Sequence, residues 1–252
     1  MKRNLLLLSM LLFGIIACNG TSSNLRPRTT THDAVHANIN LGMEYMRQGN
    51  YEKALEILER ARMIDPGYFD TYNMLGIFYQ TIGDNNEAER NFKRALSLSH
   101  NSPGILNNYG QLLYAMDKCD KAIDLFMEAA GNPLYDTPEI PYYNAGRCAL
   151  KQGNATRAEQ YLRKSLEINP TLPASLIAMS EVSFENKNYL SARGYLQRYM
   201  EVSENTPRSL WLGIQIENEL GDKNAVSSYA LLLRNNFPTS KEAALMEQAG
   251  IR

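Results

Sequence analysis

Cysteine, histidine and tryptophan are scarce in this chain. Among its 252 residues there are three cysteines, three histidines and one tryptophan. Three cysteines are too few to build a fold from disulfides. Only His32 and His36 have the His-x-x-x-His spacing, and no Cys-x-x-Cys pair occurs, so little material remains for a zinc site. We therefore expect no metal and no cofactor.

An excess of charge of one sign is missing as well. Lysine and arginine total 26 and aspartate and glutamate total 27, which gives a formal net charge of −1. Without a polybasic block, binding to nucleic acid is not expected. A hydrophobic fraction of 44% and a charged fraction of 21% are ordinary for a globular protein, and they argue against a disordered chain or a polytopic membrane protein.

Motifs for chemistry are absent too. The sequence has no His-Glu-x-x-His, no Gly-x-Ser-x-Gly and no glycine loop with lysine for phosphate. We place His32 in a linker and expect His36 and His100 to be solvated. The carboxylate-rich stretch 52–59 is typical of an exposed helix face and not of a catalytic pair. We therefore expect neither an enzyme nor a small-molecule substrate.

One apolar run stands out, and it lies at the N-terminus. Lys2 and Arg3 precede residues 5–16, which are apolar except for Ser9 and Gly14. This run is shorter than the roughly 20 residues that a membrane-spanning helix needs, and it fits the core of a secretion signal. It ends in Ile-Ile-Ala-Cys at 15–18, which resembles the bacterial lipobox. That resemblance implies a signal peptide at 1–17 and lipidation of Cys18; a plain signal peptide with a chance cysteine is the alternative.

The residues after Cys18 suggest where the protein is held. Asn19 in place of aspartate implies the outer membrane, by the sorting pattern of many such lipoproteins. Residues 19–33 contain one large apolar side chain, Leu25, and cannot form a core. We expect 18–34 to be a flexible tether between an acyl anchor in outer-membrane lipid and a folded domain on the periplasmic face.

Glycines recur at a fixed interval through the rest of the chain. Gly42, Gly76 and Gly110 lie 34 residues apart, and Gly146 follows 36 residues later. Apolar residues recur around each of them at three- and four-residue spacing, which predicts amphipathic helices. Small residues mark the second part of five successive units: Ala54, Ala88, Ala122, Ala158 and Ala192.

This pattern resembles the tetratricopeptide repeat (TPR), a helical hairpin, across about residues 35–238. Gly49, Gly83, Gly153 and Gly221 are predicted to end the first helix of their units, because glycine easily takes a left-handed conformation. A single hairpin cannot bury its apolar face, so neighbours stack into a solenoid. We predict an all-α TPR domain at 35–252, with six helix-turn-helix repeats at about 35–68, 69–102, 103–138, 139–172, 173–206 and 207–238 and a C-terminal capping helix within 239–252.

A TPR solenoid presents a groove lined by the first helix of each unit. By repeat register, the candidate protein-binding residues are Met43, Met46, Asn73, Ile77, Asn107, Gln111, Tyr143 and Arg147. Methionine and isoleucine can form shallow apolar pockets, and amides can pair with the backbone of an extended peptide. We expect Asn73, Asn107 and Gln111 to be exposed, because buried amides need partners. For Ile77 the alternative is packing against the next helix.

Several segments resemble, in order and spacing, the type IV pilus biogenesis and stability lipoproteins of the PilF/PilW family. The resemblance covers essentially the whole mature chain. It implies a pilotin or assembly factor that binds the pilus secretin and promotes its outer-membrane localisation or multimerisation. A general periplasmic TPR scaffold for envelope or cell-wall assembly is the alternative. The segments are 107–110 (NNYG), 132–138 (NPLYDTP), 144–149 (NAGRCA), 209–213 (SLWLG) and 233–238 (LRNNFP).

Two cysteines remain after Cys18. By register, Cys119 begins the second helix of unit three and Cys148 lies late in the first helix of unit four, so the two regions should be neighbours. A disulfide is possible in an oxidising periplasm. In the resembling family the first cysteine tends to follow the NNYG motif closely, where this chain has Tyr114. Two buried free thiols are therefore the alternative.

Overall fold

The computed structural model describes residues 30–251. The predicted signal peptide, Cys18 and nearly all of the predicted tether therefore lie outside the described residues. Within 30–251 every regular element is an α-helix, which confirms the all-α prediction. No helix of this part of the chain is long and apolar enough to cross a membrane.

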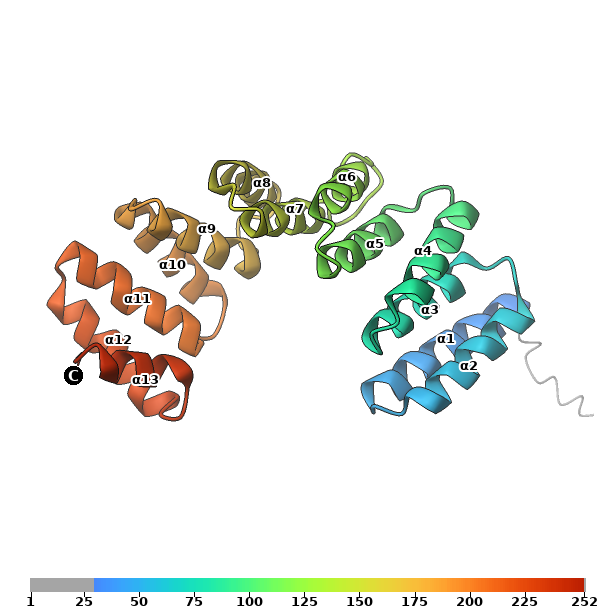
Figure 1. The fold of residues 1–252 in the computed structure, drawn as a ribbon, viewed down its shortest axis with the longest axis horizontal. Coiled ribbons are helices and arrows are strands. Elements are labelled where there is room, and N and C mark those ends of the chain that lie inside the picture. The colour runs from blue at the N-terminus through green and yellow to red at the C-terminus, as the bar shows by residue number, and fades with distance from the viewer. Residues whose placement is uncertain (1–29, 252) are drawn as a thin grey trace, which may run out of the picture.

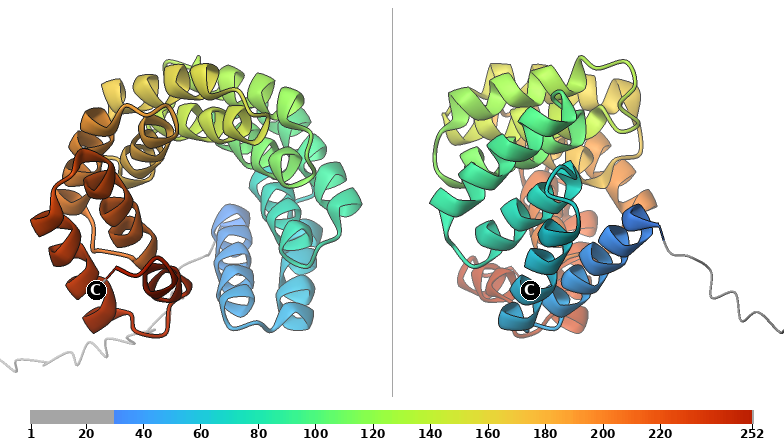
Figure 2. Two further views of the ribbon diagram at one scale, coloured as in Figure 1. Left: turned by 60° about the vertical axis from the view of Figure 1, so that its left-hand side comes forward. Right: turned by 90° about the vertical axis from the view of Figure 1, so that its right-hand side faces the viewer.

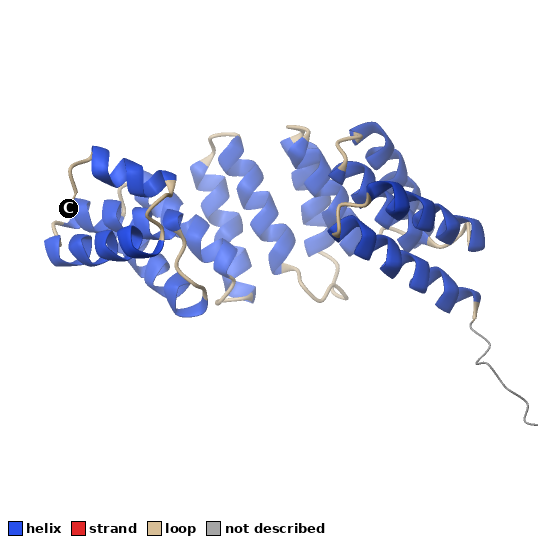
Figure 3. Ribbon diagram, turned by 90° about the horizontal axis from the view of Figure 1, so that it is seen from below, coloured by secondary structure: helices blue, strands red, loops and turns tan. Residues whose placement is uncertain are grey.

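The helices form six antiparallel hairpins that follow one another along a curve, with a short helix at the end (Figure 1). Seen from below, the hairpins stand side by side as a row (Figure 3). The TPR solenoid predicted from the repeats is thus confirmed. The helices are α1 (Thr31–Arg47), α2 (Tyr51–Ile64), α3 (Phe69–Thr81), α4 (Asn85–Ser99), α5 (Pro103–Ala115), α6 (Cys119–Ala130), α7 (Glu139–Lys151), α8 (Ala155–Ile168), α9 (Pro173–Glu185), α10 (Tyr189–Val202), α11 (Pro207–Leu220), α12 (Lys223–Asn236) and α13 (Lys241–Gln248).

The first helix begins earlier than the sequence predicts. Thr30 caps α1 by accepting a hydrogen bond from the backbone N–H of Asp33, and the Asp33 carboxylate accepts one from the N–H of Thr30. This reciprocal capping box satisfies two backbone donors at the helix start. His32 therefore lies in α1 and not in the linker where we expected it.

A left-handed residue follows the first helix of each of the six hairpins. Gly49, Gly83, Gly153 and Gly221 have φ between 72° and 82°, as predicted. Units three and five place Asp117 (φ 59°) and Lys187 (φ 60°) at the equivalent turns. The turn geometry is therefore kept even where the sequence departs from glycine, at a cost of roughly 1 kcal/mol per residue.

Close packing within each hairpin depends on a small residue in the first helix. A Cβ added to Gly110 would lie 2.5 Å from Phe126 of the opposite helix, and one added to Gly42, Gly76 or Gly146 would lie 2.7–2.9 Å from its nearest neighbour. Unit five has Ser180 at this position, where its hydroxyl donates to the carbonyl of Ala192 at 2.8 Å. The glycine pattern thus marks the line where the two helices of a hairpin touch.

Contacts between hairpins place the first helices on the inner side of the curve. α1 contacts α3, α3 contacts α5, α5 contacts α7 and α9 contacts α11, whereas the second helices show no such row among the described residues. On a bent stack the helices that approach one another lie at the shorter radius. The bend carries the first hairpin round towards the C-terminal helices (Figure 2). α7 and α9 lack a comparable contact in the described part of the chain.

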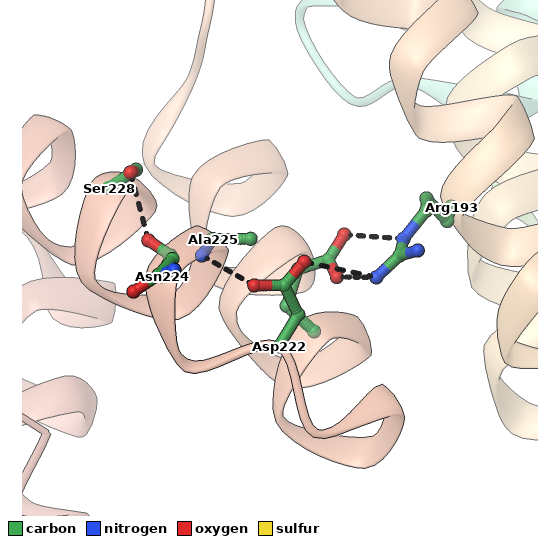
Figure 4. A network of polar contacts seen from close by, with 6 residues as sticks. Arg193, Asp222, Asn224, Ala225 and Ser228 are labelled. Carbon is green, nitrogen blue, oxygen red and sulfur yellow. Dashed lines mark hydrogen bonds and ion pairs between the residues drawn. The ribbon is translucent and has the colours of Figure 1, made fainter.

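The last units are joined by a charged contact. Arg193 of α10 donates from Nε to the carboxylate of Glu217 in α11 at 2.8 Å and pairs with it through a second nitrogen. The Glu217 side chain is only 4% exposed. Asp222, which caps α12, lies 3.8 Å from the same guanidinium (Figure 4). Arg193 thus neutralises a carboxylate that is buried between two repeats.

Helix α13 closes the C-terminal end. Its buried residues Ala243 and Met246 pack with Leu210, Ile214 and Leu233 of the sixth hairpin. This cluster covers an apolar face that has no seventh repeat to meet it. The final helix therefore acts as the predicted cap.

Candidate functional site

The inner row of first helices has a repeating register. Met43, Ile77, Gln111, Arg147 and Glu181 each follow the small close-packed residue of their helix by one position. The small residue faces its own hairpin, so the next residue points towards the neighbouring first helix or the solvent on the inner side. This row contains four of the eight predicted binding residues.

A cavity of about 640 Å³ lies between the first helices of units one and two; we call it the N-terminal cavity. It contains three of the eight predicted residues, Met43, Met46 and Ile77. Met43 is 38% exposed, and Met46 and Ile77 are half-buried. The sequence analysis missed the other lining residues, Asn40, Arg47 and Met74. Met74 precedes Ile77 by three residues, a spacing that pointed to this face.

The N-terminal cavity is suited to an apolar side chain of a partner. Methionine side chains are flexible and polarisable, so they adapt to occupants of different shape. Burial of a leucine- or phenylalanine-sized side chain contributes about 1.5–3 kcal/mol. Arg47, at the edge, carries a charge that the described structure pairs with Glu44. The cavity is thus an apolar hollow with a polar rim.

The predicted exposure of the amides is wrong for Asn107. Its side chain is 6% exposed, and its Oδ1 accepts a hydrogen bond from Nδ2 of Asn144 at 2.9 Å. Asn73 is half-buried and accepts from Asn108 at 3.1 Å. These amides join successive first helices and fix the spacing between repeats. The signal was present as asparagine pairs 35 and 37 residues apart.

A cationic, aromatic stretch occupies the middle of the inner face. The guanidinium of Arg147 lies 4.4 Å from the ring centre of Tyr114 and 5.7 Å from that of Tyr143. The Lys151 ammonium lies 4.7 Å from the Tyr114 ring and pairs with Asp117. Gln111 is half-buried on the same helix as Tyr114. Arg147 and Tyr143 are therefore brought together as predicted, but the cation covers the rings of its own chain.

His36 is engaged as well, contrary to the expectation that it is solvated. Its Nε2 lies 2.7 Å from the hydroxyl of Tyr68, the residue before α3, and its ring packs edge-on against Tyr68 and His32. This contact joins the start of α1 to the loop before α3. Among the described residues no group of three or more potential ligands could hold a metal ion.

Cys119 and Cys148 lie side by side as buried free thiols, at the helix positions predicted from the register. Burial, with a smaller contribution from the hydrogen bond to Cys119, raises the pKa of the Cys148 thiol to about 12. A thiol held in this state reacts slowly, so oxidation to a disulfide would have to precede or accompany folding.

The bridge itself stays a prediction. Two buried free thiols are the alternative, whereas a bridge between these neighbouring thiols would form in protein that folds in an oxidising periplasm. Denaturation and alkylation without reductant, followed by mass spectrometry of the mature chain, would then label neither Cys119 nor Cys148. Two labelled thiols would exclude the bridge.

Comparisons with known proteins agree with this architecture. Models of the tetratricopeptide repeat match residues 33–99, 67–131 and 140–172. The type IV pilus assembly protein PilF of Pseudomonas aeruginosa is 29% identical over 238 residues, which is 94% of each chain. A solved structure of PilF from that organism superimposes with a TM-score of 0.77 over 87% of this chain and 99% of that one. The crystal structure of PilW, a widely conserved type IV pilus biogenesis factor, is 31% identical with a TM-score of 0.76, over 84% of this chain and 97% of that one. The chain belongs to the PilF/PilW family.

Membership of the PilF/PilW family confirms the resemblance found in the sequence. The chain is a TPR protein of type IV pilus biogenesis, and TPR proteins bind protein partners. PilF and PilW are covered almost from end to end, so the whole solenoid and its cap are shared with them.

Proposed function

We propose that this PilF/PilW protein is an outer-membrane lipoprotein that binds the type IV pilus secretin through its inner face. It promotes the localisation or multimerisation of the secretin in the outer membrane. It acts by binding and not by catalysis. The observation that supports the proposal is similarity to PilF and PilW over nearly the whole chain, combined with an apolar cavity on the face where TPR proteins hold their partners.

The N-terminal cavity is our candidate for the main contact. In protein interfaces a few anchor side chains that fill pockets supply most of the binding free energy. Met43, Met46 and Ile77 line such a pocket, and Arg47 and Asn40 border it. An apolar anchor of a secretin segment would be desolvated there, while the amide pairs at Asn73 and Asn107 join α3, the second wall of the cavity, to the first helices that follow it.

The anchor and tether give the binding face its location. Acyl chains on Cys18 would hold the protein in the membrane, since each buried CH₂ contributes about 0.8 kcal/mol. About 15 residues at ~3.3 Å each allow a reach of roughly 50 Å. The solenoid can then meet a secretin subunit in the periplasm and bring it to the outer membrane.

The experiment is recovery of the secretin from gently solubilised envelopes with tagged protein, quantified by mass spectrometry. Met43→Glu places a charge in the N-terminal cavity. Met63→Glu is the matched control, because Met63 is 74% exposed on α2. We expect wild type and Met63→Glu to recover the secretin and Met43→Glu to recover at least about ten-fold less, the effect of roughly 1.4 kcal/mol.

Other results would count against parts of the proposal. Equal recovery by both variants would remove the cavity from the binding site. Recovery of cell-wall or other envelope assembly proteins, with no secretin, would favour the general periplasmic scaffold. Cys18→Ala should release the protein from the outer-membrane fraction while the purified solenoid still binds the secretin. Unchanged fractionation of that variant would refute the lipid anchor.

A further inference from the structure

A second cavity lies on the same inner face at the other end of the solenoid. It has a volume of about 380 Å³ and lies between the first helices of units five and six, α9 and α11. We call it the C-terminal cavity. By register it corresponds to the N-terminal cavity: Glu181, Phe184 and Glu185 occupy the positions that Met43, Met46 and Arg47 occupy in unit one. The position is the same, but the chemistry is different.

Aromatic rings and carboxylates form the walls of the C-terminal cavity. Phe184 and Trp211 are half-buried, one from each helix. Glu181 accepts two hydrogen bonds from Arg208, each of 2.5 Å. Glu185 is exposed and has no cationic partner among the described residues. The charged lining residues are thus two carboxylates and one guanidinium, which leaves one negative charge without a partner.

The surroundings of Glu181 are consistent with a deficit of positive charge. Its side chain is 24% exposed. Burial, opposed by the smaller effect of Arg208, raises the pKa of this carboxyl, and the nearby Glu185 raises it further. A second cation would stabilise both carboxylates in their charged form.

In the middle of the solenoid, the position equivalent to Phe184 is covered by a cationic side chain of the same chain. Tyr114 occupies in unit three the position that Phe184 occupies in unit five, and its ring is covered by Arg147 of the next unit at 4.4 Å. The residue equivalent to Arg147 in unit six, counted back from the turn glycine, is Gln215, which lines the cavity and carries no charge. The chain therefore supplies its own cation between units three and four and none from that position between units five and six.

We propose that the C-terminal cavity binds an arginine side chain presented by a segment of a partner protein. The guanidinium would lie against Phe184 and Trp211 and pair with Glu185. Arginine suits such a place because its planar group stacks on rings and donates two parallel hydrogen bonds to a carboxylate. This site is separate from the N-terminal cavity, and it does not depend on the identity of the protein that binds there.

The single tryptophan of the chain makes the site directly observable. Trp211 is the only tryptophan in the sequence, and it lines the cavity. The probe is the blocked pentapeptide acetyl-Gly-Gly-Arg-Gly-Gly-amide, titrated into the mature protein while the indole N–H resonance of Trp211 is followed by NMR. The same peptide with citrulline in place of arginine is the uncharged control of equal shape.

We expect a saturable indole shift with the arginine peptide, with roughly millimolar affinity, and none with the citrulline peptide. Glu185→Gln should weaken binding about three- to ten-fold. Glu201→Gln, the same change at an exposed position of α10, should leave it unaltered. Raising the salt concentration should weaken binding, since the pair is partly exposed.

Three outcomes would overturn the proposal. Equal shifts with arginine and citrulline peptides would show that charge is not recognised, and equal affinity of Glu185→Gln and wild type would remove the carboxylate from the site. An indole shift that depends on protein concentration without peptide would assign the cavity to a second copy of the chain. The titration contains no secretin, so its failure leaves the proposed function standing, and failure to recover the secretin leaves this site standing.

Discussion

At the scale of single residues, the close-packed glycines carry much of the fold. Each of them removes a side chain at the line where two helices of a hairpin touch, so the opposing Phe or Leu can pack directly on the backbone. The amphipathic pattern alone would produce helices. The glycines decide how near those helices come.

Gly110→Ala tests this contact. The added methyl would lie 2.5 Å from Phe126, which is fully buried and cannot move away freely. We expect a loss of about 1–3 kcal/mol in the free energy of unfolding, measured with urea. Gly104→Ala, in the same helix with nothing within 4 Å of the new Cβ, is the control and should be neutral or stabilising by up to about 1 kcal/mol. Equal effects of the two variants would contradict the packing role.

Glu89 provides a test of pH dependence. Hydrogen bonds from Lys93 and then Tyr109 lower the pKa of its carboxyl to about 2, against an ordinary value of 4.5. Because the folded-state pKa is the lower one, the stabilisation is complete above about pH 4.5 and is lost as the pH falls towards 2.

Glu89→Gln should therefore lower the free energy of unfolding by about 1–2 kcal/mol at pH 7, a value reduced for the 23% exposure of the side chain. The difference from wild type should shrink at pH 2.5. Urea unfolding at both pH values measures it, with the exposed Glu52→Gln as control. A difference that is the same at both pH values would rule out the carboxylate as its source.

At the scale of helices, the contact between α10 and α11 depends on a buried ion pair. Arg193→Leu would leave Glu217 charged and without its guanidinium between two repeats. Removal of one partner of a buried pair typically costs 3–5 kcal/mol. We expect a loss of about that size in urea unfolding.

The double variant Arg193→Leu/Glu217→Leu separates charge from packing. It also removes the unpaired carboxylate of Glu217 and should restore much of the lost free energy of unfolding. A double variant as unstable as Arg193→Leu alone would show that packing of the arginine stem matters more than its charge.

The helices were largely predictable, whereas the contacts between them were not. The 34-residue interval and Gly49, Gly83, Gly153 and Gly221 were enough to place hairpins and turns. The burial of Asn107 depends on an amide 37 residues away in the next hairpin, and periodicity within one helix contains no information about that partner. The same reason applies to Arg147, which covers Tyr114 of the preceding unit. The N-terminal cavity was predicted in part, because register identifies which residues face inwards but not which of them leave a hollow.

At the scale of the whole molecule, each repeat is stabilised mainly by its contacts with the adjacent repeats, as in other solenoids. The end of such a stack needs a cover, and α13 supplies it. Met246→Glu would place a charge in the fully buried contact with the sixth hairpin. We expect α13 to detach and expose the apolar face beneath it, so that the protein associates in solution.

Light scattering and urea unfolding measure this effect. Gln248→Glu adds the same charge at an exposed position of the same helix and should leave both unchanged. Monomeric, fully stable Met246→Glu protein would mean that the last repeat needs no cover.

The row of contacts between first helices is interrupted once in the described residues, between α7 and α9. α1, α3, α5 and α7 contact one another in series, and α9 contacts α11, but α7 and α9 lack such a contact among residues 30–251. One buried cluster extends to Cys148 on α7 and the next begins at Leu162 on α8, and Tyr143 and Leu150 of α7 pack against this second cluster. The row of first helices is therefore interrupted here while α8 and α9 still pack together, and one of the two cavities lies on each side of the interruption. Bending between α7 and α9 would change the distance between the two cavities, so a partner that binds in both would restrain that bending.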